Sequence, residues 1–236
     1  MRARALAGVA GPVVFTAAWV AGSLRQTGHG VLSVQLSGLA APDARDPWIM
    51  ITGFLVLGGC LVIFGLELTG AAARLIQAAG VLAIAAGLLR RDHMELIAGP
   101  VSWHNQAHNV VSLVLYADMV VAQFLLARGL GGVWRRYLFA SGAATAIALA
   151  LFLPNTANAS AGLLQRIAVT IPLLAVLSVA VRLMDDRGRT HPAGSGIQRR
   201  CAASPSARTP AQISRRSRPR PARSSGSEPG SLPPEA

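Results

Sequence analysis

The chain has 236 residues, of which 52% are hydrophobic and only 14% are charged. Soluble domains carry about 25% charged residues, so this composition argues against a water-soluble enzyme. All 22 basic residues are arginine, and with 10 acidic residues they give a formal net charge of +12. Residues 185–236 alone hold ten of the arginines and four of the acids. Because the positive charge is unevenly placed in this way, we expect no nucleic-acid partner.

Six apolar runs alternate with short polar breaks, and each run is close to the ~20 residues that cross a hydrocarbon core as a helix. In lipid only helices and closed barrels pair every backbone group, and the runs lack the alternation of barrel strands. The sequence therefore predicts an all-α integral membrane bundle of six transmembrane helices. The expected spans are residues 6–24, 48–68, 72–89, 108–126, 137–153 and 163–181.

The first run follows a basic start and therefore also resembles a secretory signal. It is long for a signal, and five further runs follow, so we expect a retained first helix. Six spans place both termini on one side of the membrane. Nine arginines near span ends fall on that side and five on the other, which predicts a cell-membrane protein with cytoplasmic N- and C-termini.

Two segments are expected to lie outside the spans. After a transmembrane domain of residues 1–184, residues 185–236 contain ten Arg, eight Pro and nine Ser, a composition typical of a disordered tail. Its arginines either remain solvated or meet anionic lipid headgroups. Membrane lipids are expected partners, and the sequence does not identify a protein partner. In the first outer loop, Leu32, Leu36 and Leu39 are spaced as on a helix. Residues 31–40 are therefore expected to form a short helix in the outer interface or folded back over the bundle.

Ionisable groups within membrane spans are costly, so each is a functional candidate. One arc of the fourth helix, about 120° wide, carries four polar residues: His104, His108, Ser112 and Asp118. We expect this stripe to face the bundle interior. An alternative role for Asp118 is structural: a protonated carboxyl group, or one paired with a hydroxyl or an arginine, would hold helices together. Arg166, near the start of the sixth span, either snorkels to headgroups or faces inward to hold an anionic headgroup.

The histidines at positions 104 and 108 have the i, i+4 spacing that shared metal ligands often have. The same outer loop carries Asp92, His93 and Glu95. A catalytic zinc site needs three protein ligands held in place, and a mixed-charge loop is usually solvated. We therefore expect neither a metal nor a cofactor.

Three segments of the chain carry motifs of a known family. They are Gln35-Leu36-Ser37-Gly38-Leu39-Ala40 leading to Trp48-Ile49-Met50, the His104-x3-His108-Asn109 run with Ser112, and Gly162-Leu163-Leu164-Gln165-Arg166-Ile167. Over about residues 5–183 the chain resembles the DUF998 family of prokaryotic multi-pass membrane proteins. It departs from the family pattern at Gly38 and Asn109, where acids are common.

The resemblance implies a six-helix membrane fold without a known activity. All the matching stretches map to the outer boundary given by the arginine count. We therefore expect these polar residues to converge there: Ser37, Asp92, His104, His108, Gln165 and Arg166.

These observations favour a non-enzymatic membrane protein whose outer-face polar cluster, together with Asp118, binds a lipid headgroup, a small ligand or a partner. No catalytic residue is predicted. One alternative is a small-solute or proton-coupled transporter that uses Asp118 near the midplane. Another is an intramembrane lipid hydrolase with His104 or His108 as base or metal ligand, Asp92 as acid partner, and Ser37 or water as nucleophile. It ranks last because nothing in the sequence fixes these groups together and no GxSxG elbow surrounds the serine.

Overall fold

The structure, a computed structural model, describes residues 2–27, 30, 32–94 and 100–189. Within these ranges it contains six α-helices and two short 3₁₀ helices, and no strand. The elements are α1 (Arg2–Arg25), η1 (Leu36–Ala40), α2 (Pro47–Gly65), α3 (Gly70–Leu88), α4 (Trp103–Arg128), α5 (Gly132–Phe152), η2 (Leu153–Asn155) and α6 (Ala161–Arg189). All six α-helices are long and apolar enough to cross a membrane, which confirms the predicted all-α fold with six membrane-length helices.

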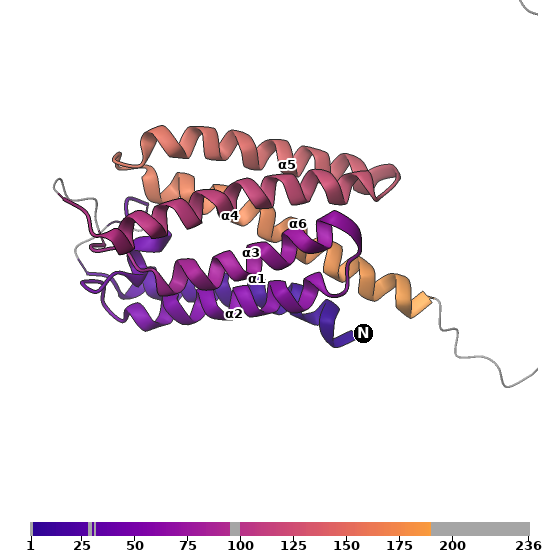
Figure 1. The fold of residues 1–236 in the computed structure, drawn as a ribbon, viewed down its shortest axis with the longest axis horizontal. Coiled ribbons are helices and arrows are strands. Elements are labelled where there is room, and N and C mark those ends of the chain that lie inside the picture. The colour runs from indigo at the N-terminus through magenta and orange to yellow at the C-terminus, as the bar shows by residue number, and fades with distance from the viewer. Residues whose placement is uncertain (1, 28–29, 31, 95–99, 190–236) are drawn as a thin grey trace, which may run out of the picture. The chain divides into compact units, whose positions relative to one another are not determined.

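The six helices pack in chain order as a closed ring, in which each helix contacts its sequence neighbours and α6 returns to α1. The start of α1 and the end of α6 lie at one end of this bundle, and η1 and the α5–α6 connection lie at the other (Figure 1). We call the second of these the loop end. Residues 185–189, assigned to the tail from the sequence, belong to α6. The rest of the predicted tail lies outside the described residues.

Helices α1, α2 and α3 approach one another closely through small residues. A Cβ atom added at Gly58 of α2 would lie 2.4 Å from the Gly80 carbonyl oxygen of α3, and one added at Gly80 would lie 2.5 Å from the Gly58 carbonyl oxygen. On the α1–α2 side, a Cβ at Gly53 would lie 2.7 Å from the Ala18 Cβ. Since lipid offers no hydrophobic drive for association, such close contact supplies the dispersion energy that holds helices together.

Helices α4 and α5 are joined instead by buried polar side chains. The Gln123 amide donates to Thr145 Oγ1 at 3.1 Å, and Ser141 Oγ donates to Gln123 Oε1 at 2.6 Å. All three side chains are buried. Their mutual pairing meets the requirement that polar groups inside a membrane find partners within the protein.

The connection between α1 and α2 enters the loop end of the bundle. All five residues of η1 are buried, so this segment is folded inward and not laid on the surface. It is shorter than the predicted helix over residues 31–40, and Leu32 is 55% exposed whereas Leu36 and Leu39 are almost fully buried. The prediction left open a helix in the outer interface or one folded back over the bundle. The structure has only a five-residue 3₁₀ helix, and it is buried.

Replacing Gly58 with Ala tests the close contact between α2 and α3. The new methyl would meet backbone and Ile84 atoms within 2.5 Å, so the helices must separate, and we expect a loss of about 1–3 kcal/mol in stability. Thermal unfolding of the purified protein in detergent measures this. The matched control is Gly59→Ala, because a Cβ there has nothing within 4 Å. Equal effects of the two substitutions would contradict the account.

Candidate functional site

A cleft of about 270 Å³ lies at the loop end between α4, the end of α5 and the start of α6. We call it the loop-end cleft. Nine residues with polar groups, from five parts of the chain, line it together with three apolar residues: Gln35, Ser37, Arg91, His108, Asn109, Ser112, Tyr116, Thr156 and Gln165. Its apolar residues include Leu113 and Leu153, which are 51% and 47% exposed. The cleft therefore reaches the outer surface of the bundle at these two leucines.

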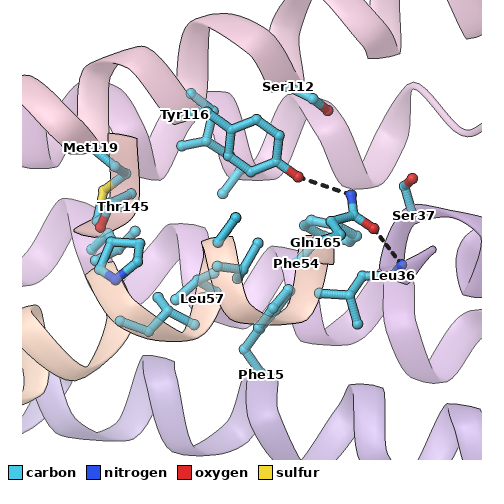
Figure 2. A pocket seen from close by; sticks show the side chains of 17 residues that line it. Phe15, Leu36, Ser37, Phe54, Leu57, Ser112, Tyr116, Met119, Thr145 and Gln165 are labelled. Atoms are coloured by element: carbon cyan, nitrogen blue, oxygen red, sulfur yellow. Dashed lines mark hydrogen bonds between the residues drawn. The ribbon is translucent and has the colours of Figure 1, made fainter. Parts of the chain in front are cut away.

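A second, mainly apolar cavity of about 50 Å³ lies in the middle of the ring, and residues from all six helices and η1 line it (Figure 2). We call it the central cavity. It shares four lining residues with the loop-end cleft: Ser37, Ser112, Tyr116 and Gln165. The two spaces are therefore neighbours that share this part of their walls.

Arg91 is the charged residue of the loop-end cleft. It is only 5% exposed, and its Nη1 donates to Gln35 Oε1 at 3.1 Å. Burial lowers the pKa of Arg91, and the charges of Asp43 and Asp92 act in the opposite direction. Among the described residues, however, no ion pair includes Arg91. A buried guanidinium thus faces the cleft with an amide as its described hydrogen-bond partner.

His108 fixes the geometry of the cleft wall. Its Nδ1 lies 3.0 Å from the Ala86 carbonyl oxygen and 2.6 Å from that of Leu89, at the end of α3. A ring nitrogen between two carbonyls is a donor, so Nε2 of the neutral imidazole is the acceptor. The Ser112 hydroxyl, 3.3 Å away, donates to Nε2. His108 therefore satisfies carbonyls that the end of α3 would otherwise leave open, and it orients Ser112.

Gln165 stands at the junction of the two spaces. Its Oε1 accepts the Leu36 backbone N–H at 2.6 Å, and its Nε2 donates to the Tyr116 hydroxyl at 2.9 Å. Figure 2 shows both bonds. One buried amide thus ties α6 to η1 and to α4, at the boundary between the loop-end cleft and the central cavity.

Arg166 neither snorkels outward nor lines either space. It is 6% exposed, and its guanidinium donates to the Val34 carbonyl oxygen at 2.8 Å and to Ser23 Oγ at 2.9 Å. The same group lies over the Trp19 ring, 5.3 Å from the centroid. Its contacts join the first loop to α1 and α6, so its described role is structural.

The remaining predicted residues are distributed around the site. Ser37 is buried and lines both spaces. Asp92 accepts from the Ser102 hydroxyl at 2.5 Å and its backbone N–H at 2.7 Å, which lowers the pKa of Asp92 and ties it to the start of α4. His104 is exposed and stacks on Trp103 with a centroid distance of 3.7 Å.

Asp118 is half-buried and lines neither the cleft nor the central cavity. One of its carboxylate oxygens is buried without a hydrogen-bond partner. Glu95 lies outside the described residues. Within the described ranges, no three His, Cys, Asp or Glu side chains come together as metal ligands.

The structure therefore brings Ser37, His108 and Gln165 to one cleft and places Asp118 and Arg166 elsewhere. Sequence reasoning missed Arg91 as a site residue, because Arg90 beside it looks equivalent in a loop. Gln35 and Tyr116 were missed as well. Gln35 does stand at the head of a family motif, which was the available signal.

A family model described as "Protein of unknown function (DUF998)" matches residues 9–182. No curated protein and no solved structure matches the chain. The three motif segments all lie within the matched range. The hydrogen bonds of Gln165 connect η1, the start of α6 and α4, so these distant segments belong to one structural unit.

Replacing Arg166 with Gln tests its structural role. Loss of two charge-assisted hydrogen bonds should destabilise the purified protein by about 2–3 kcal/mol, seen as a lower melting temperature. The matched control is Arg45→Gln, because Arg45 is exposed and its removal should leave the melting temperature unchanged. A variant as stable as this control would show that the guanidinium contacts contribute nothing.

Proposed function

The chain belongs to the DUF998 family and is a multi-pass membrane protein, and we propose that it binds an anionic group, such as a phosphate, in the loop-end cleft. The proposal makes it a binding protein and assigns no reaction. The anionic group belongs to a lipid headgroup or to a small free molecule. This proposal keeps the predicted binding role and rests it on Arg91, which the predicted cluster did not include.

Arg91 carries the proposal. A buried charge is costly unless it is paired, and the described residues supply an amide but no ion pair to this guanidinium. Arginine presents a planar fork of donors that matches phosphate or carboxylate oxygens. An anion in the cleft would complete the pairing that the protein leaves open.

The surroundings of Arg91 support anion binding. Gln35 Nε2 donates to the Thr156 carbonyl oxygen at 2.8 Å, which holds its Oε1 toward Arg91 and preorganises the guanidinium. Asn109 and Thr156 add neutral polar groups to the wall. No acidic residue is among the described residues that line the cleft, and Asp43 and Asp92, whose charges act on Arg91, lie outside its lining.

The two alternatives find less support in this geometry. A transporter based on Asp118 requires a route past that carboxyl group, and Asp118 lines neither space. A hydrolase based on Ser37 requires a histidine at that hydroxyl. The described bonds instead place Ser112 at His108 Nε2.

We also propose that the loop end faces outward and both termini face the cytoplasm of a cell-membrane protein. The support is the arginine count of nine against five near the span ends, in line with the excess of basic residues in cytoplasmic loops. This orientation puts Arg91 at the depth of the outer headgroups.

The test compares Arg91→Gln with Arg90→Gln, since Arg90 is the adjacent exposed arginine. Native mass spectrometry measures retention of phosphatidic acid by each protein in phosphatidylcholine nanodiscs, and a parallel titration uses inorganic phosphate. We expect Arg91→Gln to weaken phosphatidic acid binding by about tenfold or more and Arg90→Gln by less than about twofold. Arg91→Lys, which keeps the charge and loses the fork, should fall between them. Equal binding by Arg91→Gln and Arg90→Gln would overturn the proposal.

A further inference from the structure

The proposed anion site does not involve the central cavity. Because this cavity adjoins the loop-end cleft, it can hold another part of the same ligand. We infer that the ligand is an amphiphile of the outer leaflet, whose anionic head lies at Arg91 and whose single hydrocarbon chain occupies the central cavity. This inference rests on the proposed function and adds the class of ligand to it.

The shape of the central cavity suits a chain. On α6 its lining residues run from Gln165 to Leu173, and on α2 from Phe54 to Leu61. Eight residues of helix rise by about 12 Å, so the cavity is elongated along the bundle axis. Its wall is made of residues from all six helices and η1, so the space lies along the middle of the ring. An elongated apolar space of this kind fits one extended chain better than a compact solute.

The chemistry of the cavity wall disfavours water as the occupant. A buried water needs two to four polar partners. Two of the polar groups on the wall, Gln165 and Thr145, are already engaged in hydrogen bonds inside the protein. Most of the other lining side chains are apolar, among them Phe15, Phe54 and Leu115. An empty apolar void forfeits dispersion contacts, and such voids take up apolar molecules.

The polar junction between the two spaces lies where the head of an amphiphile would join its chain. Ser37, Ser112, Tyr116 and Gln165 line both spaces. Arg91 lines the cleft but not the central cavity. The order from cleft to cavity is therefore charge, neutral polar groups and hydrocarbon, which is the order of groups along an amphiphile.

Access to the cleft is from the side of the bundle. Leu113 of α4 and Leu153 of η2 line it and are about half exposed. On a membrane protein, exposed leucines within a span meet lipid chains. A lipid of the surrounding leaflet can thus pass between α4 and the end of α5 with its tail remaining in an apolar environment.

The experiment uses a photoreactive decyl phosphate that carries a diazirine at the tip of its chain. The full-length protein in phosphatidylcholine nanodiscs is irradiated with this probe, and the adducts are mapped by mass spectrometry. A matched probe with a phosphocholine head serves as the headgroup control. We expect phosphate-probe adducts at the deep end of the central cavity, on Leu61, Met119 or Leu173, in clear excess over lipid-facing Ile147 and Val121.

Three variants make the test specific. Ala83→Leu and Ala168→Phe narrow the cavity from opposite walls, since both alanines are fully buried and line it. Each should reduce the deep adducts at least about fivefold while Arg91-dependent phosphate binding persists. Ala146→Leu, at an exposed position on α5, should leave the adduct pattern unchanged. Because the two substitutions act from opposite walls, the test still stands if one of the two variants fails to fold.

The outcomes separate the two claims. Adducts confined to lipid-facing residues, with Arg91-dependent phosphate binding intact, would overturn the chain assignment and leave the proposed function standing. Deep adducts that are equal for both headgroup probes and unaffected by Arg91→Gln would overturn the anionic head. Deep adducts that persist in both cavity variants would also overturn the placement of the chain.

Discussion

A polypeptide segment can enter the interior of a membrane bundle only if its backbone polar groups find partners inside the protein. The α1–α2 connection meets this constraint through the first turns of α6. The Leu163 N–H donates to the Leu32 carbonyl oxygen at 2.8 Å, the Arg166 guanidinium to Val34, and the Leu36 N–H to Gln165 Oε1. At Gly162 an added Cβ would lie 2.3 Å from the Val34 carbonyl oxygen. The glycine therefore permits the approach that the hydrogen bonds require.

The inward position of η1 also determines where the second loop lies. An added Cβ at Gly38 would be 2.3 Å from the Met94 carbonyl oxygen, and Asp43 Oδ1 accepts the Met94 N–H at 2.8 Å. The loop that carries Arg91 is thus held against the first loop, beside Gln35. An acid at position 38 would require the second loop to move. The cleft is consequently built from loops that a single set of backbone contacts keeps in place.

Much of the fold could be predicted from the sequence, because span length and hydropathy are local properties. The motif segments predicted that six polar residues converge at one end of the bundle. Ser37, His108 and Gln165 line the loop-end cleft, whereas Asp92, His104 and Arg166 line neither the cleft nor the central cavity. The roles of Arg91 and Arg166 could not be predicted. Whether Arg91 is buried and the adjacent Arg90 exposed depends on how two loops pack, and the contacts of Arg166 depend on where the first loop lies. The helical arc that grouped Asp118 with His108 was too coarse for the same reason. Residues on one arc face different neighbours when a helix packs between two others.

The most direct test of this account is amide hydrogen exchange of residues 34–41 in nanodiscs. If α6 pairs this backbone inside the bundle, exchange should be slower than in residues 154–160 by about a hundredfold or more. Gln165→Ala, which removes the partner of the Leu36 amide, should remove most of this protection, whereas the exposed-residue control Gln106→Ala should not. Rapid exchange of residues 34–41 in the unmodified protein would contradict an inward first loop and the cleft built on it.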